Sequence, residues 1–166
     1  MAAAAGGGHS AAVGEDGSLF VWGHGSQGQL GTGDTAVRLA PTRVAGLPAP
    51  VRQVAAGFRH TGMVTEAGDL LMCGCGRQGH LGQGDEDNRA TPTLVARAVL
   101  DGEAVLMVSC GTHHTVVATE GGGVYTFGLG EDGRLGHGDE EDQLAPVLPW
   151  HRHSAHQRAE KVGRPR

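Results

Sequence analysis

The residues in this sequence that look most like a chemical site are glycines in the pattern Gly-x-Gly-x-x-Gly, which occurs at 23–28, 74–79 and 128–133. In dinucleotide-binding proteins this pattern cradles a pyrophosphate, provided that a helix opens at the third glycine and an acidic residue follows about 20 positions later. Here Leu-Gly-x-Gly-Asp follows each copy instead, and that segment cannot begin a helix. We therefore interpret these glycines as architectural, giving positive φ and close backbone approach, and expect no cofactor.

Three histidines, His9, His60 and His114, could in principle form a metal set. Each of them lies 14 residues before one of the glycine patterns and is followed by serine or threonine. Equivalent positions in consecutive units of a repeat protein lie in separate units. We therefore expect each imidazole to hydrogen-bond within its own unit, because buried polar groups are usually satisfied locally, and we expect no metal site.

The segment Cys73-Gly74-Cys75 invites a metal or redox interpretation. A structural zinc site requires four ligands, usually in two spaced pairs, and the only other cysteine in the sequence is Cys110. Cys73 aligns with aromatic residues in the other copies, so it is predicted to fill the core. Three cysteines cannot all pair within the chain, which indicates a reducing compartment, and we expect a cytoplasmic or nuclear protein.

Two acidic clusters follow the second and third glycine patterns. They could be solvated loops, or they could form one face of the molecule directed at a basic partner, since clusters at one repeat position add their fields. The candidate partner-binding residues are Asp85, Glu86, Asp87, Asp139, Glu140, Glu141 and Asp142.

All of these residues belong to one internal repeat. Its anchor, Gly-x-Gly-x-x-Gly-x-Leu-Gly-x-Gly-Asp, occurs three times at spacings of 51 and 54 residues. Such self-similarity is typical of solenoids and propellers. The recurring positions, to which we assign structural roles, are Gly23, Gly25, Gly28, Leu30, Gly31, Gly33, Asp34, Gly74, Gly76, Gly79, Leu81, Gly82, Gly84, Asp85, Gly128, Gly130, Gly133, Leu135, Gly136, Gly138, Asp139, His9, His60 and His114.

Each unit contains short apolar runs separated by turn residues, for example 19–22, 70–73 and 124–127. A proline, such as Pro41 or Pro92, is expected to begin the last strand of a unit. Four short strands per ~50 residues indicate a propeller blade, and the 30 glycines among 166 residues argue against helical repeats. The predicted fold is all-β: a partial β-propeller of about three four-stranded antiparallel blades, arranged as an open arc rather than a closed ring.

The repeats are expected to fill one domain over 1–149, with units at approximately 6–56, 57–110 and 111–149. The first five residues, being alanine-rich, are not expected to form a proper strand. Residues 150–166 carry five basic side chains and one acidic side chain, and they are predicted to form a disordered basic tail.

The segment Gly57-Phe58-Arg59-His60-Thr61 and the three anchors resemble the regulator of chromosome condensation family over about residues 6–149. The resemblance implies a closed propeller of roughly seven blades in complete members. We therefore expect this chain to be a fragment or a shortened variant of a longer propeller. Some members sense ultraviolet light through tryptophan in this segment. Phe58 replaces that tryptophan here, so photoreception is not expected.

The net charge and the motifs argue against several classes of function. The net charge of −5 argues against a general nucleic-acid binder, and no apolar stretch approaches the ~20 residues of a membrane span. We recognise no P-loop and no nucleophile–base pair, so we predict a non-catalytic protein–protein interaction module. The resemblance leaves two alternatives: an exchange factor, or part of one, for a small Ran-like GTPase, and a propeller segment of a larger ubiquitin ligase.

Overall fold

The computed structural model describes residues 1–150, and β-strands dominate this part of the chain. Three short 3-10 turns, η1 (Arg77–Gly79), η2 (Arg97–Leu100) and η3 (Glu131–Gly133), lie in the connections. The strands are β1 (Ala2–Ala5), β2 (His9–Val13), β3 (Leu19–Gly23), β4 (Arg38–Arg43), β5 (Val51–Ala56), β6 (His60–Thr65), β7 (Leu70–Gly74), β8 (Arg89–Leu94), β9 (Val105–Cys110), β10 (His114–Thr119), β11 (Val124–Gly128) and β12 (Gln143–Trp150).

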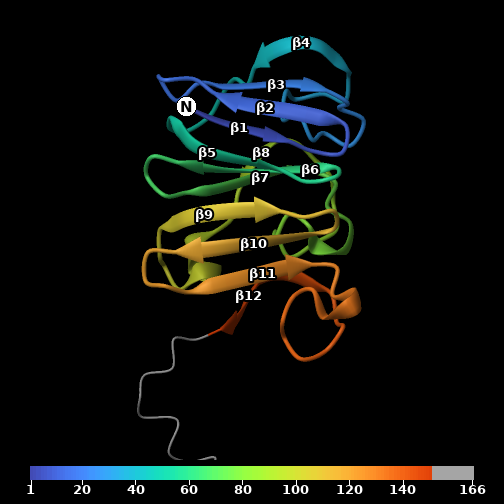
Figure 1. Cartoon of the computed structure of the whole chain (residues 1–166), viewed down its shortest axis with the longest axis vertical. Coiled ribbons are helices and arrows are strands. Elements are labelled where there is room, and N and C mark those ends of the chain that lie inside the picture. Colours follow the sequence, from blue (N-terminus) through green and yellow to red (C-terminus); the bar gives the residue numbers. More distant parts are fainter. Residues whose placement is uncertain (151–166) are drawn as a thin grey trace, which may run out of the picture.

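The strands form three antiparallel sheets of four, in the orders β1-β2-β3-β4, β5-β6-β7-β8 and β9-β10-β11-β12. The sheets are stacked face against face like successive blades (Figure 1). β1, β5 and β9 meet along one side of the stack, since β5 contacts both of the others. The prediction of an all-β partial propeller with three four-stranded blades in an open arc is confirmed. A sequence unit such as 6–56 contributes three strands to one blade and the first strand to the next.

Two apolar clusters lie between the blades and hold them together. The cluster between the first and second blades includes Leu19 and Val21 from one side and Met63 and Leu71 from the other. The cluster between the second and third blades is built in the same way and contains Phe127, which is completely buried. Successive side chains of a strand point to opposite faces, so the middle blade buries both faces, and its strands β6 and β7 are buried throughout.

Two local expectations are wrong. The alanine run Ala2–Ala5 does form a strand, β1, which pairs along its whole length with β2. Small side chains suit this place, because β1 also lies against β5. Pro41 and Pro92 do not begin the last strand of their blades but lie inside β4 and β8. These are edge strands of the sheets, where a residue without an N–H group is tolerated.

The basic tail predicted for residues 150–166 lies outside the described residues from 151 onward. Within the described part of the chain, no helix has the length and hydrophobicity needed to cross a membrane.

Candidate interaction surface

The first and second glycine-rich loops each reach from their own blade to the outermost strand of the following blade. The Gly33 N–H donates to the Ala90 carbonyl at 2.9 Å, and the Gly84 N–H donates to the Leu144 carbonyl at 2.9 Å. The two contacts occupy equivalent places in the repeat. The Gly-Asp end of the anchor is therefore part of the junction between blades.

The third glycine of the pattern lets the loop lie directly on the neighbouring backbone. A Cβ added at Gly79 would come within 2.4 Å of the Leu144 Cα, and one added at Gly28 within 2.6 Å of the Arg89 carbonyl oxygen. Both glycines also have positive φ, +78° and +86°, which side chains disfavour. These close contacts give the glycine pattern a physical role at the blade junctions.

The histidines join blades rather than bonding within them. His9 Nε2 lies 2.7 Å from Thr61 Oγ1 of the second blade, and His60 Nε2 lies 3.1 Å from Thr115 Oγ1 of the third. The expectation of bonds within each blade is therefore wrong. The sequence did contain a signal: serine or threonine follows each of the three repeat histidines, so the blades that follow His9 and His60 carry a hydroxyl residue at the equivalent position.

The same threonines complete a relay into the preceding glycine-rich loop. Thr61 Oγ1 donates to the Gln29 carbonyl at 2.7 Å, and Thr115 Oγ1 donates to the His80 carbonyl at 2.9 Å. A hydroxyl has only one proton, so the threonine accepts from the histidine Nε2–H while it donates to the carbonyl. This assigns the neutral Nε2–H tautomer to His9 and His60.

Three buried histidines keep their rings neutral. Burial lowers the pKa of His9 to about 4. It lowers the pKa of His60 to about 3, with a smaller contribution from the nearby His80. Burial also lowers the pKa of His80 to about 4. Within residues 1–150, neither ring nitrogen of His80 has a hydrogen-bond partner. These rings are therefore uncharged at neutral pH, and their protonation at low pH destabilises the contacts between the blades.

Mild acid should destabilise the fold through these rings. The unfolded chain binds protons at histidine below about pH 6.5, whereas folded His9, His60 and His80 resist protonation down to about 4, about 3 and about 4. Stability is therefore fully present above pH 6.5 and falls from about pH 6.5 down to about 4 through His9 and His80 and down to about 3 through His60, by at most ~1.4 kcal/mol per pH unit for each ring. Urea unfolding at several pH values measures this slope.

His80→Gln is the matched variant, because Gln29 occupies the equivalent position in the first blade. It should reduce the slope by the contribution of one ring and leave the unfolding midpoint at neutral pH nearly unchanged. An unaltered pH dependence in His80→Gln would contradict the assignment.

Two of the three cysteines are buried, and Cys110 is partly buried beside the apolar cluster between the second and third blades. Cys73 and Cys75 are buried, and the Cys73 Sγ lies 3.7 Å from the Gln29 carbonyl oxygen. Burial raises the pKa of both Cys73 and Cys110 to about 12, so these thiols are weak nucleophiles. Among residues 1–150, no group of three histidine, cysteine or acidic side chains is arranged to hold a metal ion.

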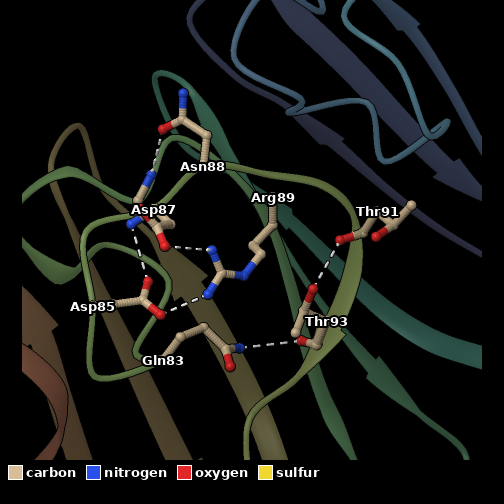
Figure 2. Close-up of polar contacts among 8 residues, drawn as sticks. Gln83, Asp85, Asp87, Asn88, Arg89, Thr91 and Thr93 are labelled. Carbon is tan, nitrogen blue, oxygen red and sulfur yellow. Dashed lines mark hydrogen bonds and ion pairs between the residues drawn. The ribbon is translucent and has the colours of Figure 1, made fainter.

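The acidic loop that follows the second glycine pattern contains its own counter-ion. Asp85 Oδ2 accepts from Arg89 Nη2 at 2.6 Å, and the Asp87 carboxylate lies 3.8 Å from Arg89 Nη1 (Figure 2). Glu86 accepts from the Gln78 N–H at 3.1 Å. The first loop repeats the main pair with Asp34 and Arg38 at 2.7 Å. The pairing of these arginines was not predicted from the sequence, although the Asp-x-x-x-Arg spacing occurs in both loops.

The acidic loop that follows the third glycine pattern differs in its charge pairing. Gln143 stands where the first two loops have arginine, and among the described residues no cation pairs with the carboxylates of Asp139, Glu140, Glu141 and Asp142. All four residues are exposed. Asp139 and Asp142 accept backbone N–H groups of the loop, at 3.1 and 2.8 Å. Glu140 and Glu141 make no such side-chain contact with the described residues. The clusters are thus alike in position but unlike in charge balance.

Comparisons with known proteins agree on one family. The model described as the regulator of chromosome condensation (RCC1) repeat matches residues 16–64, 67–118 and 121–154. The ultraviolet-B receptor UVR8 of Arabidopsis thaliana is 43% identical over 144 residues, which cover 86% of this chain and 32% of the receptor. The human probable E3 ubiquitin-protein ligase HERC3 is 40% identical over 140 residues, covering 83% of this chain and 13% of the ligase.

A solved structure shares both the fold and some sequence. Prp20p of Saccharomyces cerevisiae superposes with a TM-score of 0.80 at 26% identity, covering 90% of this chain and 38% of Prp20p. The chain therefore spans well under half of the length of each of these relatives. Three tandem matches, and blades joined through the repeated glycines and histidines, show that the chain belongs to the regulator of chromosome condensation (RCC1) repeat family.

Proposed function

We propose that the chain is a non-catalytic protein-interaction module, whose loop 139–142 binds a basic segment of a partner protein. The observation that carries the proposal is the missing arginine of the third loop. The first two loops neutralise their anchor aspartate internally, at 2.7 and 2.6 Å, whereas the third has no described cation beside it. Exposed carboxylates that are not neutralised within the fold attract cationic partners and speed their association.

Family relatives support a protein partner of this general kind. The solved Prp20p structure is described together with its binding to Gsp1p and to histones. A second structure shows the yeast protein bound to Kap60. The net charge of this chain, −5, is in keeping with a cationic partner rather than a phosphate backbone.

The double variant Glu140→Gln/Glu141→Gln tests the role of the loop. These two side chains were chosen because Asp139 and Asp142 hold the loop in shape. Binding of a short fluorescein-labelled peptide rich in lysine and arginine, followed by fluorescence anisotropy at low salt, should weaken by about 3- to 10-fold. Each lost charge pair in water is worth only ~0.2–1 kcal/mol, and the difference should shrink as salt is added.

The matched control is Glu15→Gln/Glu66→Gln. Both glutamates are exposed, and they lie in the β2–β3 and β6–β7 turns, away from the glycine-rich loops. This variant loses the same two charges and should bind the peptide like the unaltered chain. Equal weakening in both variants would show that only net charge matters and would refute a specific site.

A guanine-nucleotide exchange factor for a Ran-like GTPase is the second candidate, favoured by the similarity to Prp20p. It is tested by release of labelled GDP from a panel of small GTPases with and without the chain. Acceleration would establish exchange activity, and its absence would leave the interaction module. Similarity to HERC3 covers 13% of that ligase, so a role as the propeller segment of a ligase is a third candidate. It needs a catalytic domain attached to these blades.

A further inference from the structure

The same three kinds of polar contact join the first blade to the second and the second blade to the third. A histidine reaches a threonine of the following blade, that threonine donates to a carbonyl of the preceding loop, and a glycine N–H of that loop donates to the outermost strand of the following blade. A blade therefore has two unlike faces. One provides the histidine and the loop, and the other provides the hydroxyl and the strand.

The third blade presents the first kind of face without a described neighbour. We call it the trailing face, and it consists of the half-buried side chains of His114, Val116, Ala118 and Val124, together with the end of the third loop. Within this face, a Cβ built at Gly133 meets no described atom within 4 Å, whereas one built at the equivalent Gly79 meets backbone at 2.4 Å.

The exposed inner strand extends this face with apolar side chains. Leu106 and Met107 of β9 are 42% and 59% exposed. The equivalent residues of the middle blade, Arg52 and Gln53, hydrogen-bond to the carbonyls of Val105 and Val108 in β9. The trailing face therefore presents both polar and apolar groups whose equivalents in the middle blade contact the following blade.

The first blade presents the second kind of face. We call it the leading face, and it consists of the half-buried side chains of Ser10, Ala12, Phe20 and Trp22 with the exposed strand β4. Its equivalents in the other blades, such as Leu71 and Phe127, are buried against the preceding blade. Leu39 of β4 is 96% exposed, and it stands where Ala90 and Leu144 accept the glycine N–H.

These two faces, neither of which is covered by another blade among residues 1–150, are therefore complementary. His114 of the trailing face matches Ser10 of the leading face, as His9 matches Thr61 and His60 matches Thr115. Likewise the Gly138 N–H matches the Leu39 carbonyl. No comparable match exists between two leading faces, because both would present hydroxyls, or between two trailing faces, because both would present histidines.

We propose that the trailing face of one copy of the chain docks on the leading face of a second copy, which continues the blade series across the contact. Such a contact is heterologous, so a pair of copies joined by one contact retains one free leading face and one free trailing face unless the assembly closes. Two copies contain six blades, within the usual propeller range of ~4–8. The expected assembly is a closed dimer with the same contact made twice. The proposal does not rest on the proposed function, because Glu140 and Glu141 do not take part in the matched contacts.

Two variants block the faces separately. Ala12→Arg places an unpaired cation on the leading face, and Val116→Arg does the same on the trailing face. Both side chains lie on the half-exposed side of their strand, away from the apolar clusters between the blades, so the chains should still fold. A buried charge without a partner should weaken association by more than about 100-fold. Ala45→Arg, at an exposed position in the β4–β5 loop, is the matched control.

Sedimentation velocity over increasing protein concentration gives the readout, with circular dichroism to verify folding. The unaltered chain and Ala45→Arg should form dimers, and Ala12→Arg and Val116→Arg alone should be monomers. An equimolar mixture of the two blocked variants should restore a dimer, because the trailing face of the first and the leading face of the second are both intact. This rescue is specific to a head-to-tail contact.

Other outcomes decide against the proposal. A monomeric unaltered chain would overturn it, and so would a dimer that survives either single substitution, since that dimer would use one kind of face twice. Polymers that both variants abolish would support the head-to-tail contact but overturn the closed dimer. Failure of the mixture to associate, with both variants folded, would also overturn the proposal.

Discussion

Phe127→Ala should lower the free energy of unfolding by about 3–5 kcal/mol, the usual cost of removing a fully buried aromatic ring. Phe127 has 0% exposure and packs between the second and third blades. Its ring also lies beside Gly82, where an added Cβ would come within 2.8 Å. Single domains are stable by only ~5–15 kcal/mol, so this loss should be visible as a large shift of the urea midpoint.

Trp22→Ala is the matched control, because Trp22 occupies the same repeat position on the leading face and is only half-buried. It should cost about 1 kcal/mol or less when measured at low protein concentration. A larger loss for Trp22→Ala than for Phe127→Ala would mean that the leading face is covered and the second junction is open, contrary to the structure.

Gly79→Ala should cost about 2–5 kcal/mol, the second large effect. Alanine at a φ of +78° is strained by about 1–2 kcal/mol. In addition, its Cβ would meet the Leu144 Cα at 2.4 Å and the Gln143 carbonyl oxygen at 2.5 Å, and forcing atoms into packed space costs about 1–3 kcal/mol more. Because the obstacle is backbone, it cannot rotate away. Chemical unfolding of the purified variant measures the loss.

Gly133→Ala separates the two contributions. Its φ is +67°, so alanine pays the same conformational strain, but no described atom lies within 4 Å of the new Cβ. We expect a loss of only about 1–2 kcal/mol for the monomer. If both alanine variants lost the same stability, the close approach of the second loop to the third blade would be wrong.

The repeated positions predicted the architecture well because each repeat carries its own turn and strand signals. Leu30, Leu81 and Leu135 recur at one place in the anchor and are buried alike, at 1–2% exposure. Glycines at fixed spacing mark where the chain turns with positive φ. A local signal repeated three times outweighs the weakness of any single copy, which is why the strand count and blade number followed from sequence.

The alanine strand was missed because its cause is not local. The residues of Ala2–Ala5 have low strand propensity, and the strand forms because β2 offers an edge and β5 a close surface. Tertiary context of this kind overrides propensity. Hydrogen-bond partners in different blades could not be predicted for the same reason. The sequence shows that a histidine and a threonine recur, but not that the pair that bonds is separated by 52 residues.

The positions of the acidic loops in the repeat could be predicted from the sequence, but the charge balance of each loop could not. The acidic clusters are in loops of one kind, yet two of the three anchor aspartates are already paired with arginine four residues later. Charge counts alone treat Asp85 and Asp139 as equal, whereas the replacement of arginine by Gln143 makes them unlike. The informative signal was the residue that breaks the repeat rather than the residues that keep it.

Neighbouring blades are joined by the histidine of one and the threonine of the next. Nuclear Overhauser measurements on a chain labelled at histidine rings and threonine methyl groups test this contact directly. We expect cross-peaks from His9 to Thr61 and from His60 to Thr115, whose bonded atoms lie 2.7 and 3.1 Å apart. A folded, β-rich chain with neither cross-peak, or with His60 instead contacting only its own blade, would contradict it.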